Sequence, residues 1–255
     1  MKSEKITEGA QSTIAERRWP YRDACAAAHA LELLGERWTL LVIRELMTGP
    51  RRFGDLRAGL PGISANVLTQ RLEWLEEAGV LVRRELPPPS GAKVYELTEW
   101  GYEAEPIFRV VGRWGARSPF HDPTAAFSVA SLMLSLRTMF DGRRAAGFSA
   151  RIGFRLGRET LLVEVADGGI DVRAGPIEGA GAVLTGEPRT VAAAIYGGQS
   201  FEALEAAGAL AVEGDREAAR RFTTFFPLPD KAPLPGPPSS ELHVPSPAPR
   251  RHPRP

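Results

Sequence analysis

The chain is poor in cysteine and has no long apolar run. Among its 255 residues Cys25 is the one cysteine, which excludes an intramolecular disulfide and a cysteine-rich zinc site. The four histidines lack the spacing of metal ligands, so we expect no metal. No run approaches the roughly 20 apolar residues of a membrane-spanning helix, and the first residues lack the apolar stretch of a signal peptide. We therefore expect a cytoplasmic protein that does not enter the membrane.

The chain also lacks an excess of either charge. Its 32 Lys and Arg residues oppose 31 Asp and Glu residues, and the balance is similar along the chain. A polyanion such as DNA would therefore have to be bound by locally placed cations. The motifs GxSxG, GxxxxGK[ST] and HExxH are missing, and the carboxylates show no paired arrangement. We expect neither catalysis nor a cofactor.

Proline divides the chain into regions. We interpret residues 1–20 as a disordered arm and 21–118 as a first domain, which ends where SPFHDP interrupts a helical pattern. Residues 119–226 alternate apolar segments with glycine-rich turns and form a second domain. Residues 227–255 hold half of the 22 prolines, a composition typical of a disordered tail.

The first domain has the order of parts of a winged helix-turn-helix. Helical spacing predicts helices over 23–34 and 37–48, and a short helix over 53–60. Ser64 is a predicted N-cap for a fourth helix that stops at Gly79 and buries Leu68, Leu72 and Leu75. The runs VLVRREL and KVYELT then predict a β-hairpin around PPPSGA, followed by a helix over 98–115. Such an order names duplex DNA as the ligand.

Short polar side chains on the exposed face of the fourth helix are the candidates for base recognition. Asn and Gln can bond adenine bidentately, and the basic hairpin strands are typical of a wing that contacts the backbone or the minor groove. Arginines at the start of the third helix could meet a phosphate near a helix N-terminus. Solvation explains any one of these residues, but explains their joint arrangement less well. The candidate DNA-binding residues are Arg51, Arg52, Ser64, Ala65, Asn66, Thr69, Gln70, Arg71, Arg83, Arg84 and Lys93.

The second domain reads as helices combined with strands. An apolar helix is predicted over 123–140, followed by four strand-like segments that contain RIGFRL, TLLVEVA, IDVRA and AVLTG. Two short helices, a fifth strand (ALAVEG) and a final helix (REAARRF) complete the pattern. We expect an α+β sandwich in which helices cover a sheet.

The first domain resembles the HxlR family of bacterial winged-helix regulators. The resemblance covers about 21–116 and rests on Cys25, LLGERWTLLVIREL, GPRRFGDLRAGLPGISANVLTQRLEWLEEAGVLVRREL, VYELTEWG and Trp114-Gly115. It implies a homodimer whose N-terminal and last helices pair, with each recognition helix in successive major grooves of a dyad-symmetric operator. It also implies repression or activation of neighbouring genes.

Cys25 is a possible redox sensor by the same resemblance, since some members use this cysteine as a thiol switch. The family usually has Pro after it, whereas Ala26 follows here. A reactive thiol needs a lowered pKa, for which Arg22 and a position at a helix start are possible sources. A lone cysteine in an alanine-rich helix is more often a small buried hydrophobe.

The second domain resembles a sterol-carrier-protein-like domain over about 120–226. The similarity rests on AVLTGEPRTVAAAIYGG and FEALEAAGALAVEGDREAARRF. It implies an apolar cavity between sheet and helices that binds lipids or other hydrophobic molecules, although apolar residues at helical spacing are usually plain core. The candidate ligand-binding residues are Phe127, Leu132, Met133, Leu136, Met139, Ile195, Phe201, Phe222, Phe225 and Phe226.

The sequence thus favours a dimeric DNA-binding transcriptional regulator that responds to a hydrophobic small molecule. One alternative is a lipid-binding protein that uses the winged helix only to dimerise. Another is a second domain that binds nothing and only supports the dimer.

Overall fold

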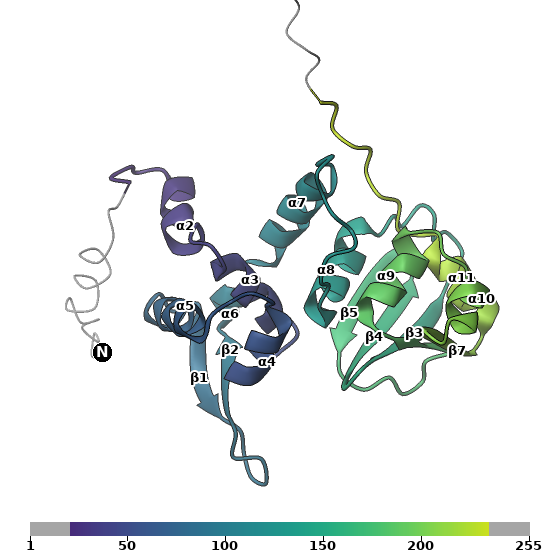
Figure 1. Cartoon of the computed structure of the whole chain (residues 1–255), viewed down its shortest axis with the longest axis horizontal. Helices are drawn as coiled ribbons and strands as arrows, with labels where there is room; N and C mark the ends of the chain where they lie inside the picture. Colours follow the sequence, from purple (N-terminus) through teal and green to yellow (C-terminus); the bar gives the residue numbers. More distant parts are fainter. Residues whose placement is uncertain (1–20, 235–255) are drawn as a thin grey trace, which may run out of the picture.

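The computed structural model describes residues 21–234, which form two packed domains (Figure 1). The winged domain extends from α2 to α7, and the second domain from α8 to α11. The arm predicted over 1–20 and the part of the tail over 235–255 lie outside the described residues.

Helices α2 to α5 build the helix-turn-helix of the winged domain. They span α2 (Ala26–Leu34), α3 (Thr39–Leu46), α4 (Phe53–Gly59) and α5 (Ala65–Glu77). The predicted order is confirmed, and α2 and α3 are shorter at their ends than the periodicity indicated. Helix α3 begins after Trp38, whose backbone takes a left-handed φ of 80°.

The hairpin pairs β1 (Leu81–Glu85) with β2 (Lys93–Leu97) in antiparallel register. The single helix predicted over 98–115 is wrong, because the chain forms α6 (Glu99–Tyr102) and then α7 (Glu105–Ala116). Pro106 stands in the first turn of α7, where a missing N–H costs no helical hydrogen bond, so it starts a new helix instead of continuing the old one.

The second domain has the predicted sequence of elements. It contains α8 (Val129–Met139), β3 (Ala150–Leu156), β4 (Glu159–Ala166), β5 (Gly169–Ala174), β6 (Ala182–Gly186), α9 (Pro188–Tyr196), α10 (Phe201–Ala206), β7 (Leu210–Gly214) and α11 (Arg216–Thr223). The helix expected over 123–140 is shorter than predicted. Ser128 caps its first turn by accepting a hydrogen bond from the Ser131 amide at 3.1 Å.

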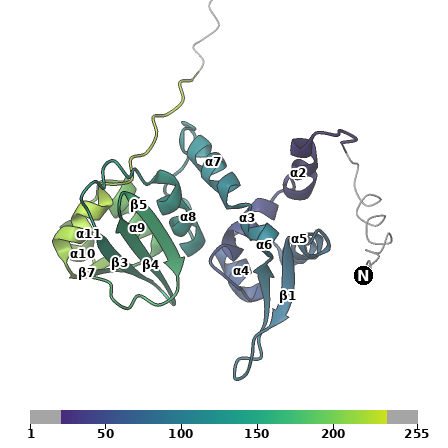
Figure 2. The ribbon, with the colours of Figure 1, turned by 180° about the vertical axis from the view of Figure 1, so that it is seen from behind.

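The five strands form one sheet in the order β5-β4-β3-β6-β7. Strands β3 and β6 pair in parallel, and the other neighbours are antiparallel. Alternate residues such as Phe154 and Val163 are fully buried under the helices. The other face, visible in Figure 2, carries ion pairs such as Arg151–Glu164 at 3.1 Å. The chain is a mixed α+β protein.

The start of the predicted tail is fastened to the winged domain. Residues 227–234 form neither helix nor strand. The Lys231 ammonium nevertheless donates to the carbonyls of Ala116 and Ser118, both at 3.0 Å, and the Ala232 amide donates to the Arg117 carbonyl at 2.7 Å. These bonds satisfy carbonyls at the C-terminal end of α7.

Candidate nucleic-acid interface

Helix α5 presents the predicted polar residues to solvent. The Ser64 hydroxyl accepts a hydrogen bond from the Val67 amide at 3.2 Å, which confirms the predicted N-cap. Leu68, Leu72 and Leu75 are fully buried, also as predicted. The opposite side of the helix is exposed and carries Ala65, Asn66, Thr69, Gln70 and Glu73.

Arg71 is directed away from this exposed side. Its side chain is 14% exposed, and its Nη1 lies 3.2 Å from a carboxylate oxygen of Glu36 in the turn between α2 and α3. Because the side chain is mostly buried and its guanidinium group is paired with Glu36, its geometry does not fit the predicted contact with DNA. The structure gives Arg71 a role in holding α5 against the end of α2.

Trp74 makes a second contact of this kind, one that the sequence did not predict. Its indole N–H donates to the Leu33 carbonyl at 3.0 Å. Leu33 lies in the last turn of α2, where carbonyls have no helical partner, so the indole satisfies one of them. Arg71 and Trp74 stand three positions apart on one side of α5, and together they fix this helix relative to α2.

The register of the hairpin separates the three predicted wing cations. Arg83 pairs with Tyr95 and Glu85 with Lys93, so Arg83 and Lys93 lie on one face of the wing, whereas Arg84 lies on the other. Arg83 is half-exposed, approaches Glu76 at 2.8 Å and lies over the Tyr95 ring at 5.4 Å. Arg84 pairs with Glu96. All three cations are exposed at the surface.

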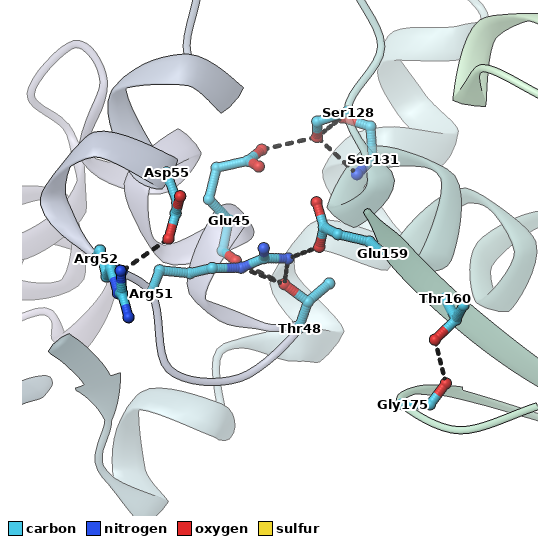
Figure 3. Close-up of polar contacts among 10 residues, drawn as sticks. All are labelled: Glu45, Thr48, Arg51, Arg52, Asp55, Ser128, Ser131, Glu159, Thr160 and Gly175. Carbon is cyan, nitrogen blue, oxygen red and sulfur yellow. Dashed lines mark hydrogen bonds and ion pairs between the residues drawn. The ribbon is translucent and has the colours of Figure 1, made fainter. Parts of the chain in front are cut away.

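Arg51 and Arg52 diverge at the start of α4. Arg52 is exposed, and its Nη2 donates to the Ser90 hydroxyl at the tip of the wing over 3.3 Å. Arg51 is 17% exposed and is paired with Glu159, at the start of β4 in the second domain. Its Nε also donates to the Thr48 hydroxyl at 3.0 Å (Figure 3). The predicted phosphate contact is therefore open to Arg52 but is blocked for Arg51 in this arrangement.

A buried carboxylate also joins the two domains, close to the Arg51–Glu159 pair (Figure 3). Glu45 on α3 is 6% exposed and accepts a hydrogen bond from the Ser128 hydroxyl at 2.8 Å (Figure 3). Gly59 leaves room for it, because a Cβ at that position would lie 2.6 Å from the Glu45 carboxylate oxygen. At the other end of α8, Arg137 pairs with Glu105 of α7. Helix α8 is thus bonded to two helices of the winged domain.

Helix α7 has an apolar stripe that remains exposed in the single chain. Ile107, Val110, Val111 and Trp114 recur at the spacing of one helix face, and Val110 and Trp114 are 71% and 77% exposed. On α2, Leu31 is also exposed. Neighbouring large apolar side chains that face solvent are typical of a protein–protein contact.

Cys25 is exposed and is the N-cap residue of α2. The backbone N–H groups of Ala28 and Ala27 lower the pKa of its thiol, as expected at a helix N-terminus. It is therefore not the buried hydrophobe that its alanine-rich surroundings indicated.

The predicted ligand-binding residues form the core of the second domain. All except Phe127, which is partly buried, are buried. The Phe222 and Phe226 rings lie 4.8 Å apart, so these side chains fill the space between sheet and helices. Two hollows of about 320 and 300 Å³ open elsewhere, with walls that are mainly polar, and of the ten residues Phe127 contributes to one of them. The expected apolar lining is present as packed core.

Comparison with known proteins assigns the winged domain. Residues 33–121 match the family model described as HxlR-like helix-turn-helix. An uncharacterized HTH-type transcriptional regulator, sll1512 of Synechocystis, is 38% identical over 36% of this chain and 68% of its own length. The HTH-type transcriptional regulator YodB of Bacillus subtilis is 38% identical over 33% of this chain and 76% of its own. The chain belongs to the HxlR-like helix-turn-helix family. A structure of reduced YodB has 34% identity, covers 40% of this chain and 100% of that one, and gives a TM-score of 0.35.

Membership of this family identifies a DNA-binding transcriptional regulator and not an enzyme. It favours that function over a lipid carrier with a winged helix used only for dimerisation. Among residues 21–234 no cluster of His, Cys, Asp or Glu is suited to a metal ion. No helix in this described part is long and apolar enough to span a membrane. The matched residues end before α8, so the second domain is described by its own structure.

Proposed function

We propose that the protein acts as a homodimer that binds a dyad-symmetric operator. The observation that carries the proposal is the exposed polar side of α5 next to a cationic wing in a member of this family. In each copy, the first turns of α5 would enter a major groove, with Asn66, Thr69 and Gln70 at base edges. Arg52, Arg83, Arg84 and Lys93 would contact phosphates, because their guanidinium and ammonium groups are at the surface.

The proposed dimer pairs the exposed stripe of α7, together with α2, against the same surface of a second copy. A two-fold contact is self-complementary, so one apolar surface on each chain is sufficient. Pairing would place two α5 helices in one assembly and double the phosphate contacts of a chain whose net charge is only +1.

The second domain is proposed as a sterol-carrier-like domain that binds a hydrophobic effector. Its helices cover one face of the sheet over a core rich in Phe and Met, and α8 is bonded to α3 and α7. A ligand between α8 and the sheet would have to displace this packing, and could thereby shift α8 against the winged domain. Such a ligand regulates DNA binding only if it binds the two arrangements with different affinity.

DNA binding by the purified full chain tests the central proposal. Duplexes from the region upstream of its own gene, labelled with fluorescein, should bind more tightly than shuffled duplexes of equal length and composition. Equal affinity for both would reject operator recognition. Native mass spectrometry of the same preparation would detect a lipid that was co-purified, and a thermal shift series with fatty acids tests the effector separately.

A further inference from the structure

Arg51 belongs to the wing through its backbone. Its amide donates to the Tyr95 carbonyl at 2.9 Å, and the Tyr95 amide donates to the Arg51 carbonyl at 2.8 Å. Tyr95 is paired on its other side with Arg83 of β1. Directly paired residues project to the same face of a sheet, so Arg51 and Arg83 start from one face, on either side of Tyr95.

The two arginines differ in what their side chains contact. Arg83 stays within the winged domain, where it pairs with Glu76, and is half-exposed. Arg51 reaches out of the winged domain to Glu159, which lies 108 positions further along the chain. The Glu159 side chain is 36% exposed, so water still reaches the pair. An ion pair that water reaches contributes little net stability, so a competing anion can replace it.

We propose that Glu159 of the second domain competes with DNA phosphate for Arg51 and thereby lowers the affinity of the winged domain for DNA. The inference rests on the proposed function of DNA binding. A carboxylate and a phosphate offer a guanidinium group the same kind of acceptor oxygens. Glu159 therefore acts as a substitute for phosphate, held in place by the contacts of α8 with Glu45 and Glu105. Any change that separates the two domains at this seam releases Arg51.

Glu159→Gln is the variant that separates Arg51 from the second domain, because the amide cannot form the ion pair. Its affinity for the operator, or for any duplex that the wild type binds, should rise about three- to fivefold at low salt. The plot of log K against log salt should become steeper by up to about 0.9, the value for one additional phosphate contact. Glu213→Gln is the matched control, because it removes the same charge from an ion pair with Arg155 within the second domain.

The double variant Arg51→Gln/Glu159→Gln identifies the residue responsible. The affinity of the double variant for DNA should equal that of Arg51→Gln, because neither variant has the Arg51 guanidinium that the loss of Glu159 would release. A gain that persists without Arg51, or one equal to that of Glu213→Gln, would overturn the competition and indicate general charge repulsion. If no variant binds any duplex, the proposed function itself fails. Circular dichroism verifies that each variant folds. If Arg51→Gln does not fold, Glu159→Lys and Glu213→Lys replace it. The proposal then requires that Glu159→Lys bind DNA more tightly than Glu213→Lys.

Discussion

The indole of Trp74 holds the end of α2 by donating a hydrogen bond to the Leu33 carbonyl at 3.0 Å. Its helix, α5, also carries the candidate base contacts, on the side opposite the buried leucines. We therefore expect a displacement of α2 to reach α5 through this contact and through the Arg71–Glu36 pair.

Trp74→Phe should loosen this connection and leave most of the ring packing intact. The lost donor strands a carbonyl that is partly buried, which costs about 1–3 kcal/mol. We expect a lower midpoint of urea unfolding and weaker operator binding. Amide hydrogen exchange should increase at the C-terminal end of α2 but not in α9. Unchanged exchange in α2 would show that the hydrogen bond does not position the helix.

Asn66→Ala and Gln70→Ala test base recognition. Each lost bidentate base contact should weaken operator binding by about 1–3 kcal/mol and leave binding to shuffled DNA unchanged. Gln199→Ala is the matched control, because it removes an exposed amide from the second domain. Titration of labelled duplexes by fluorescence anisotropy measures all three. Equal loss on operator and shuffled DNA would mean that the two residues do not read the sequence.

Local signals were sufficient to predict helix α5 and the hairpin of β1 and β2. Ser64, the leucine stripe and Gly79 specify α5 within one stretch of sequence, and the alternation in VLVRREL specifies β1. The same signals could not show that Arg71 points toward Glu36, since the direction of a side chain depends on the neighbouring helix. The Thr98 hydroxyl caps the start of α6 by accepting a hydrogen bond from the Gly101 amide at 3.0 Å. Such a cap indicates where a helix begins but does not indicate that α6 ends after one turn.

No local sequence pattern predicted the contacts between the two domains. Arg51 and Glu159 are ordinary charged residues in the sequence, and the packing of α8 on α3 and α7 brings their two domains together. The same limit applies to the second domain, where nine of the ten residues predicted to line a cavity are buried and Phe127 is partly buried. Whether such residues line a cavity or fill it depends on how closely Phe222, Phe225 and Phe226 pack. The spacing of apolar residues along the sequence does not show how closely they pack.

Tyr196 should make stability fall at alkaline pH. Burial raises the pKa of its phenol above the ordinary value of 10.0, and its hydroxyl donates to the Ser135 hydroxyl at 2.8 Å. Above about pH 10 the unfolded chain loses this proton and the native state keeps it, so the free energy of unfolding falls as pH rises, by at most about 1.4 kcal/mol per pH unit. Below pH 10 this group contributes no slope.

Urea unfolding between pH 8 and pH 11 measures this effect. Tyr196→Phe should remove part of the alkaline slope, whereas Tyr21→Phe, which changes an exposed ring, should retain it. If both variants follow the wild type, the Tyr196 phenol ionises in the native state as readily as in the unfolded chain.

Cys25 should react faster than an unperturbed thiol at neutral pH. The amides of Ala28 and Ala27 lower its pKa below the ordinary 9.0, so more of it is thiolate, the reactive form. Iodoacetamide should give one adduct. The pH at which the alkylation rate reaches half its maximum should be lower for the folded chain than for the urea-unfolded chain.

If Cys25 is a redox sensor, diamide should change operator binding of the wild type and not of Cys25→Ser. An equal response of both would remove Cys25 as the sensor.

The exposed stripe on α7 should control the oligomeric state. Val110→Glu and Trp114→Glu place charges in the centre of the proposed contact, where they would be buried without partners, a penalty of several kcal/mol. Light scattering after size exclusion should show a dimer for the wild type and a monomer for the double variant. Phe120→Glu is the matched control, because this ring is 82% exposed but lies beyond the end of α7.

The monomer should retain the secondary structure of the wild type and bind a single half-site of the operator. Its affinity for DNA should depend less steeply on salt, because half of the phosphate contacts are lost. A double variant that remains dimeric would place the contact on another surface.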